Sequence, residues 1–213
     1  MLAKRNLFLT LLALGVLVTG CGSLHQPGPQ IEYYSLEYEN PTVQPGGEML
    51  PVLLRLSGFA ASPLLQTDRI VYRDKAFSSN LYFYHRWRAK PAELVTHFLA
   101  RDLQRSGFFQ AVSSSFGNIP HTHGVEGTVD KFMEWDDDNG WQAVISLLVT
   151  LTDDRESDPG KRVLFQQEFT AAKPCGGKQP REVAAAMSLA MAEVSSLIAN
   201  QIHQTIAAQG PRQ

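Results

Sequence analysis

Apolar and polar residues alternate along three segments in the second half of the chain. In the segment from Trp141 to Thr152, the apolar positions of one side are Ala143, Ile145, Leu147, Val149 and Leu151. The segments 125–134 and 163–171 alternate in the same way. Alternation with a period of two is typical of strands with one packed face and one face near water. The pattern predicts an antiparallel meander, with Asn139-Gly140 as a type I′ hairpin turn.

The first half contains shorter runs that also favour strands. Alternating or continuous apolar residues predict strands at Glu32 to Tyr38, Pro51 to Leu56, Arg69 to Arg73 and Leu81 to Tyr84. The last two are expected to form a hairpin joined by the residues from Lys75 to Asn80.

Two segments have the periodicity of amphipathic helices. Pro91 occupies the favoured first turn of one helix, which Gly107 ends. The second helix extends from about Pro180 to Ala207 and carries an apolar stripe long enough to cover a sheet. The resulting order, β-β-β-β-α-β-β-β-β-α, predicts a single α+β domain, in which two helices pack on one face of a mostly antiparallel β-sheet.

The N-terminus has the organisation of a secretory signal. Lys4 and Arg5 precede an apolar stretch from Leu7 to Val18, and small residues follow at Thr19-Gly20. The stretch is about twelve residues long, whereas a transmembrane helix needs roughly 20. We therefore predict a signal peptide over residues 1–20 rather than a permanent membrane span.

Cys21 follows the predicted signal directly. The sequence Val18-Thr19-Gly20-Cys21 resembles the lipobox of bacterial lipoproteins. The resemblance implies that Cys21 carries diacylglycerol on sulfur and an N-acyl chain such as palmitate, as the first residue of the mature protein. Each buried acyl CH₂ contributes roughly 0.8 kcal/mol, so several chains anchor a protein firmly. The alternative is an ordinary secreted protein in which Cys21 is a thiol.

The residues after Cys21 bear on sorting and on domain boundaries. Gly22 and Ser23 follow, without an acidic residue. By resemblance to lipoprotein sorting in enteric bacteria, this favours the periplasmic side of the outer membrane over the inner membrane. Residues 21–31 contain Pro and Gly without periodicity and predict a flexible tether after the lipidated cysteine. The folded domain is expected over residues 32–208, and a disordered tail over 209–213.

Charge and cysteine content narrow the functional classes. The chain has 19 basic and 21 acidic residues, and removal of the two basic residues of the signal leaves a formal charge of −4. Nucleic acid and anionic lipid surfaces are therefore poor electrostatic partners for the body of the protein. Once Cys21 is acylated, only Cys175 remains, so no intramolecular disulfide can form. Cys175 is either an inert, partly buried thiol or a reactive or intermolecular one.

Motifs for catalysis and metal binding are weak or absent from the sequence. It contains no G-x-S-x-G, H-E-x-x-H or glycine-rich phosphate loop. His121-Thr122-His123 could supply two imidazoles to a metal, but a site needs further ligands. The acidic run Asp136 to Asn139 is better explained as a solvated hairpin tip than as a calcium loop, because Trp135 stands where the first ligand is needed. We therefore expect that the protein is not an enzyme and that it binds no metal and no cofactor other than the covalent lipid.

Aromatic residues are concentrated in the first predicted hairpin. They are Tyr72, Phe77, Tyr82, Phe83, Tyr84 and Trp87. A short hairpin cannot bury so many rings within itself, although strand alternation would turn about half of them into the core. The rest predict a docking edge for a protein partner or for the apolar part of a lipid. The candidate partner-binding residues are Tyr72, Phe77, Tyr82, Tyr84 and Trp87.

Several segments of the mature chain follow one another in a recognisable order. They are Tyr33 to Leu36, Thr67 to Arg73, Tyr82, Tyr84 and Arg86-Trp87, the helix from Pro91 through Leu99 to Leu103, Phe108 to Val112, and Ala190, Val194, Leu197 and Ile198 of the closing helix. In order and spacing they resemble the auxiliary lipoproteins of MCE-type ABC transport systems, the PqiC-like family. The turn Asp153 to Gly160 and the loop Pro174 to Gly177 depart from the pattern.

The resemblance implies a non-enzymatic periplasmic component of a lipid transport system. Its expected partners are an MCE-domain protein, the membrane components of an ABC transporter and the membrane that holds the lipid anchor. Assembly into a homo-oligomeric ring is an option that the resemblance leaves open. Two alternatives are a stand-alone lipoprotein that binds lipid between the sheet and the long C-terminal helix, and a structural envelope lipoprotein.

Overall fold

The computed structural model describes residues 28–39, 47–114, 120–137 and 140–210. The chain divides into a unit Met1–Gln30 and a unit Ile31–Gln213. The predicted signal peptide, Cys21 and most of the predicted tether lie outside the described residues, as do residues 211–213 of the predicted tail. The fold described below is that of the second unit.

Its helices and strands follow the predicted order, with three short additions. They are β1 (Glu32–Tyr34), β2 (Leu50–Leu56), β3 (Ala60–Ala61), the 3₁₀ helix η2 (Pro63–Leu65), β4 (Arg69–Lys75), β5 (Ser78–Trp87), α2 (Pro91–Arg105), β6 (Phe109–Ser114), β7 (His123–Asp137), β8 (Gly140–Asp153), α3 (Pro159–Arg162), β9 (Val163–Pro174) and α4 (Pro180–Ala208). The additions are β3, η2 and α3.

The antiparallel meander is confirmed by the two longest ladders of the sheet. β7 pairs with β8 from His123↔Asp153 to Asp137↔Gly140, and β8 pairs with β9. The five alternating apolar residues of β8 are fully buried. The predicted turn was wrong by one residue, because Gly140 already pairs with Asp137 as the first residue of β8, with φ +103°. Asn139 lies outside the described residues.

The second edge of β7 is covered by three strands in succession. β2, β3 and β4 each pair in parallel with a different part of it, at Leu54↔His123, Ala60↔Thr128 and Val71↔Met133. Beyond this edge the sheet divides, because β2 continues to β6, whereas β4 continues to β5 and then to β1. The nine-stranded sheet thus has two arms on one side of β7.

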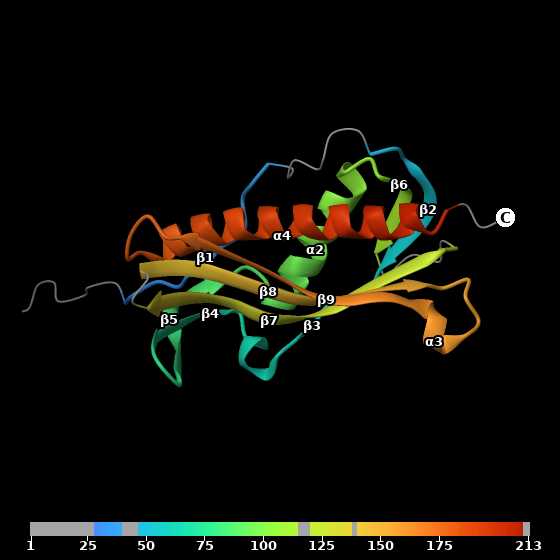
Figure 1. Cartoon of the computed structure of the whole chain (residues 1–213). Coiled ribbons are helices and arrows are strands. Elements are labelled where there is room, and N and C mark those ends of the chain that lie inside the picture. Colours follow the sequence, from blue (N-terminus) through green and yellow to red (C-terminus); the bar gives the residue numbers. More distant parts are fainter. Residues whose placement is uncertain (1–27, 40–46, 115–119, 138–139, 211–213) are drawn as a thin grey trace, which may run out of the picture. The chain divides into compact units, whose positions relative to one another are not determined.

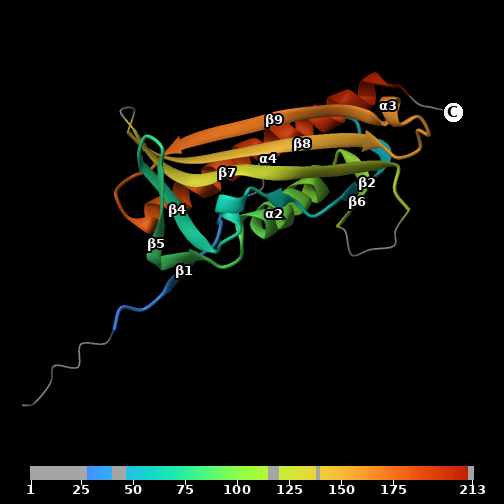
Figure 2. The same ribbon diagram turned by 90° about the horizontal axis from the view of Figure 1, so that it is seen from below.

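Both long helices cover one face of this sheet. Figure 2 views the sheet from the other side, with α4 and α2 behind its strands. α4 packs along β8 and β9, and it also contacts α2 (Figure 1). Pro91 lies in the first turn of α2, and Gly107, with φ +73°, follows its C-terminus. The predicted α+β class and the single face covered by helices are confirmed.

The first strand is shorter than predicted. It ends at Tyr34 rather than Tyr38, because the chain then leaves the sheet edge and turns its side chains into the core. Leu36 is buried there, and the Tyr38 hydroxyl donates a hydrogen bond of 2.7 Å to Oδ2 of the buried Asp102 on α2. Packing against α2 therefore replaces strand pairing after Tyr34.

Candidate functional site

The β4–β5 hairpin carries the five predicted partner-binding residues, and the structure separates them. Phe77 lies at the turn with its side chain fully exposed, and Tyr84 is also exposed. Tyr72 and Tyr82 are half-buried, and their ring centroids lie 4.9 Å apart. Trp87 is only 1% exposed.

Trp87 is therefore a core residue, and its prediction as a surface residue was wrong. Its ring packs edge-on against Phe132, with 5.1 Å between the centroids. At this position β1 pairs with β5 through Tyr34↔Trp87, so Trp87 lies inside the sheet rather than at its edge. The candidate surface consists of the hairpin residues nearer to the turn.

Tyr82 faces a buried carboxylate rather than solvent. Its hydroxyl donates to Glu134 Oε2 at 2.9 Å, and Trp141 Nε1 donates to the other carboxylate oxygen. Burial raises the pKa of Glu134, although these two hydrogen bonds and the charge of Lys178 act in the opposite direction. Burial and the bond to Glu134 likewise raise the pKa of Tyr82. This cluster stabilises the hairpin from its inner side.

We expect a Glu134→Gln variant to change how stability depends on pH. The folded-state pKa of Glu134 lies above its ordinary value of 4.5, so its contribution is fully present below that pH and is lost as the pH rises through the folded pKa. Each unit of the rise corresponds to roughly 1.4 kcal/mol. Urea unfolding of the wild type should show a decline in stability above this pH that the amide variant lacks.

The control for this prediction is Glu126→Gln, because Glu126 is an exposed carboxylate on the same strand. This variant should keep the decline of the wild type. Parallel pH profiles for the wild type and both variants would contradict the assignment.

The outer face of the hairpin carries apolar side chains that sequence reasoning did not select. Leu81 and Phe83 are exposed, and the Arg69 guanidinium lies over the Phe83 ring at 5.3 Å from its centroid. The rings of Phe83 and Tyr84 are 4.7 Å apart. The alternation of β5 could have shown that Leu81 and Phe83 lie on the face opposite Tyr82.

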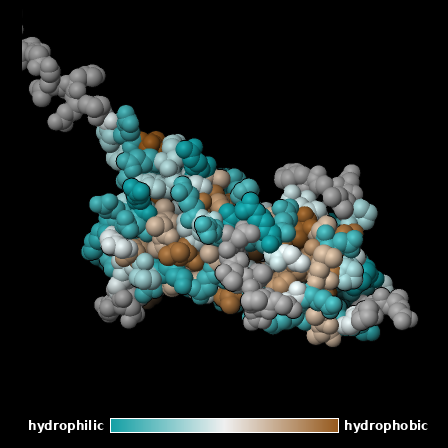
Figure 3. All heavy atoms as spheres, turned by 90° about the horizontal axis from the view of Figure 1, so that it is seen from above, coloured by the Kyte–Doolittle hydropathy of each residue, from teal (hydrophilic) through white to brown (hydrophobic). Residues whose placement is uncertain are grey.

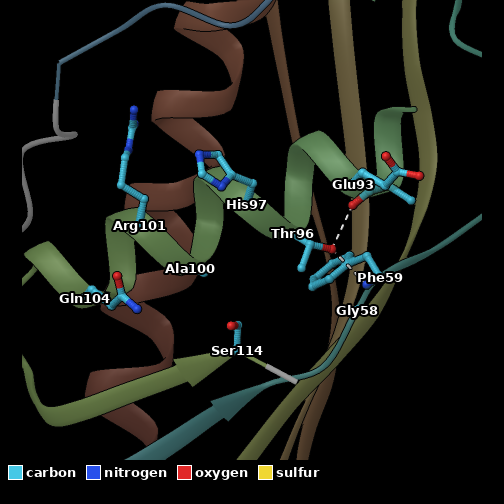
Figure 4. Close-up of a pocket in the computed structure, with 10 residues that line it drawn as sticks. Gly58, Phe59, Glu93, Thr96, His97, Ala100, Arg101, Gln104 and Ser114 are labelled. Carbon is cyan, nitrogen blue, oxygen red and sulfur yellow. Dashed lines mark hydrogen bonds between the residues drawn. The ribbon is translucent and has the colours of Figure 1, made fainter. Parts of the chain in front are cut away.

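A groove of about 530 Å³ forms a second candidate site, between α2 and the link from β2 to β3 (Figure 4). α2 contributes the short side chains of Ala92, Thr96 and Ala100. Thr96 Oγ1 accepts a 2.9 Å hydrogen bond from the Phe59 backbone and donates one of 2.7 Å to the Ala92 carbonyl. A Cβ on Gly58 would meet nothing within 4 Å, so the groove is open there.

Two charged residues, Glu93 and Arg101, line the groove, and Arg101 belongs to a structural cluster. Arg101 bonds to the buried Asp102 at 2.7 Å and stacks on Tyr38, with 4.3 Å from its guanidinium carbon to the ring centroid. In Figure 4, Arg101 and His97 project from α2 away from Ser114. Most of the exposed surface of the groove is apolar, so the groove suits an apolar group of a binding partner.

The space between the sheet and α4 is filled by side chains. The fully buried residues that α4 packs against β8 and β9 are Val183, Met187, Ala190, Met191, Val194 and Ile198. Lipid binding between the sheet and this helix, one of the sequence alternatives, is therefore contradicted by the packing. On the outer side of α4, Leu189 and Leu197 are exposed. Figure 3 shows hydrophobic residues on the helix side as separate patches among hydrophilic ones.

The predicted metal-binding candidates are not brought together. His121 Nε2 lies 3.1 Å from Asp154 Oδ2, whereas His123 is fully buried and its Nδ1 is 2.9 Å from Thr122 Oγ1. No group of three or more His, Cys, Asp and Glu side chains that could hold a metal is present in the part of the chain that the structure describes.

The remaining cysteine lies at the end of the sheet that carries Glu134. The backbone N–H of Cys175 donates to the Trp141 carbonyl at 2.8 Å. Burial, with the charges of Glu134 and Glu182, raises the pKa of this half-buried thiol to about 11. A thiol with a raised pKa is protonated at neutral pH and is a weak nucleophile.

Residues 34–199 match the family described as the ABC-type transport auxiliary lipoprotein component. The chain belongs to this family. The auxiliary lipoprotein is thus a membrane-anchored bacterial component associated with an ABC transport system, and its family is one of transport accessories rather than enzymes. A search of curated proteins gave no match.

Solved structures share the fold of the auxiliary lipoprotein. Protein XCC0632 from Xanthomonas campestris is 20% identical, with a TM-score of 0.75 over 84% of this chain and 98% of that chain. An uncharacterized protein is 17% identical, with a TM-score of 0.63 over 81% of this chain and 99% of that chain. The hypothetical protein CT253 from Chlamydia trachomatis is 10% identical, with a TM-score of 0.51 over 75% of this chain and 99% of that chain.

Within the described residues, α4 is the one helix of the auxiliary lipoprotein that is long and apolar enough to cross a membrane by length and composition. Most of that helix is buried inside the fold. A mostly buried helix of this kind is accounted for by its place in the core.

Proposed function

We propose that this chain is a non-enzymatic accessory component of an MCE-type ABC system for lipid transport between membranes. Acyl chains on Cys21 hold it on the periplasmic side of the outer membrane, and the folded domain binds an MCE-domain protein. The observation that carries this proposal is the family match over nearly all of the described fold, downstream of a sequence that resembles a lipobox.

The groove beside α2 is the surface to which we assign the partner. Its exposed surface is mostly apolar, α2 lines it with the short side chains of Ala92, Thr96 and Ala100, and Gly58 leaves it open to solvent. Its volume of about 530 Å³ falls within the range of roughly 300–1,000 Å³ that is typical of binding pockets. An apolar side chain of the partner that is fully buried there would contribute roughly 1.5–3 kcal/mol.

A Gly58→Leu variant tests this assignment by filling the groove. The backbone of Gly58 lies outside the left-handed region and its Cβ position is unobstructed, so the substitution should leave the fold unchanged. We expect the Kd for the MCE-domain protein to rise roughly ten- to a hundredfold, because one buried apolar contact is lost. Binding of the purified, solubilised protein to its immobilised partner gives the measurement.

The matched control is Ala185→Leu, which places the same isobutyl side chain at an exposed position on α4. It should bind like the wild type. Equal binding by all three proteins would show that the partner does not use the groove.

The same groove also favours a second candidate function, that of a stand-alone lipoprotein that carries a lipid. An apolar recess of this size suits a hydrophobic ligand as well as a protein side chain. Native mass spectrometry after gentle extraction separates the two candidates. A retained lipid that is absent from Gly58→Leu, without a bound MCE-domain protein, would favour the carrier.

A further inference from the structure

Positive charge is concentrated in the β4–β5 hairpin. Residues 69–87 contain four basic and one acidic residue, whereas the whole chain contains 19 basic and 21 acidic residues. The ion pairs of the described residues include Arg86, which lies 3.3 Å from Asp68, but they leave out Arg69, Arg73 and Lys75. A local basic surface therefore exists on a protein that is slightly acidic overall.

The fold extends this surface beyond the hairpin. The Arg73 guanidinium lies over the Trp135 ring of β7 at 4.2 Å, and Lys131 approaches the same ring at 5.4 Å. Tryptophan, lysine and arginine side chains are enriched where proteins contact the interfacial region of a bilayer. The sequence separates these residues by about sixty positions, and the parallel pairing of β4 with β7 brings them together.

Phe77 projects from the hairpin turn without support from the rest of the fold. Its side chain is fully exposed, and its backbone has a φ of +62°, which is unfavourable for a residue with a side chain. Glycine or asparagine would adopt this conformation at lower cost. Folding therefore does not account for phenylalanine here, whereas contact of the ring with an apolar environment would.

The acyl anchor of the proposed function, on Cys21, is attached to the chain near this turn. β1 runs parallel to β5, with Glu32↔His85 and Tyr34↔Trp87, so the chain enters β1 from the direction of the turn. The 11 steps along the chain from Cys21 to Glu32 reach at most about 40 Å when extended. The seven steps along β5 from Ser78 to His85 span only about 23 Å. The turn is therefore within reach of the surface that holds the acyl chains.

We propose that the β4–β5 hairpin is a second membrane contact, in which Phe77 enters the interface of a bilayer with anionic headgroups while Arg69, Arg73 and Lys75 meet lipid phosphates. Because the anchor makes this contact intramolecular, a weak interaction is sufficient to occupy it. The contact fixes the orientation of the domain and leaves the α2 groove free for a partner. It does not depend on the identity of that partner.

The test places an indole at the turn of the full-length acylated protein. Phe77→Trp is reconstituted in mixed phosphatidylcholine and phosphatidylglycerol vesicles, and its quenching by brominated lipid is measured after subtraction of the wild-type signal from the native tryptophans. Val163→Trp is the matched control, because Val163 is an exposed apolar residue at the opposite end of the sheet. We expect quenching of the indole at the turn and none at the control position.

A charge variant completes the test. Addition of Lys75→Glu to Phe77→Trp should lower the equilibrium constant between the membrane-bound and the free turn by at least roughly fivefold, because each cation near an anionic surface contributes about that factor. Flotation with the vesicles reports the acyl anchor independently, so loss of the anchor and loss of the hairpin contact give different results. Equal quenching at both positions, or an indole at the turn that shifts only when an MCE-domain protein is added, would overturn the proposal.

Discussion

The Trp87→Ala variant is expected to lose about 3–5 kcal/mol of its free energy of unfolding, as large aromatic residues in protein cores do when truncated. Trp87 is 1% exposed and packs on Phe132, which is fully buried, so the substitution leaves a cavity between β5 and β7. Domains of this size are typically stable by only 5–15 kcal/mol. Denaturation with urea, monitored by circular dichroism, gives the measurement.

Phe77→Ala is the control for this prediction, because the same hairpin carries Phe77 on its surface. Surface substitutions usually change stability by less than about 0.5 kcal/mol. Equal stability of the two variants, with partner binding lost in Trp87→Ala, would show that the indole contributes to binding rather than to the core.

The Cys21→Ser variant is expected to lose its lipid label completely. The thioether to diacylglycerol requires the cysteine sulfur, so a serine cannot be acylated in the same way. Unacylated protein should accumulate as a precursor that retains residues 1–20, because cleavage of a lipoprotein signal follows acylation. Growth with labelled palmitate and mass spectrometry of the N-terminal peptide give the measurement.

Cys175→Ser serves as the control, because its half-buried thiol lies in the folded domain. This variant should keep both the label and normal processing. A Cys21→Ser protein that is still cleaved and still held in the outer membrane would show that another feature anchors the chain.

The regular part of the fold could be predicted because local pattern and long-range packing agree there. The apolar side of β8 faces α4 over its whole length, so strict alternation follows from burial of one face. The α2 boundaries follow equally local rules, with proline in the first turn and Gly107 in the left-handed region after the end.

The division of the sheet could not be predicted because it depends on contacts between distant segments. β2, β3 and β4 are short, and nothing local indicates that they line up along one edge of β7. β3 has only two residues, Ala60–Ala61, which is too short for a periodic pattern. The early end of β1 is likewise a tertiary effect, since Tyr38 bonds to Asp102 of α2.

The candidate surfaces were predicted only in part. The aromatic content of the hairpin correctly pointed to exposed rings such as Phe77, but it did not reveal that Tyr82 turns toward Glu134. The overall charge of the chain suggested a poor fit to anionic lipid, because a sum over all residues conceals the local excess around Arg73 and Lys75. The groove has no sequence pattern, since it is formed where α2 meets Gly58.

Association with an MCE-type transporter is the claim on which the proposed function depends. The direct measurement is mass spectrometry of the proteins that remain bound to the wild-type lipoprotein after gentle extraction from its native membranes. The account predicts an MCE-domain protein in an amount comparable to the lipoprotein itself, with less of it bound to Gly58→Leu. Recovery of the intact, acylated lipoprotein without any MCE-domain protein, under conditions that preserve other membrane complexes, would contradict it.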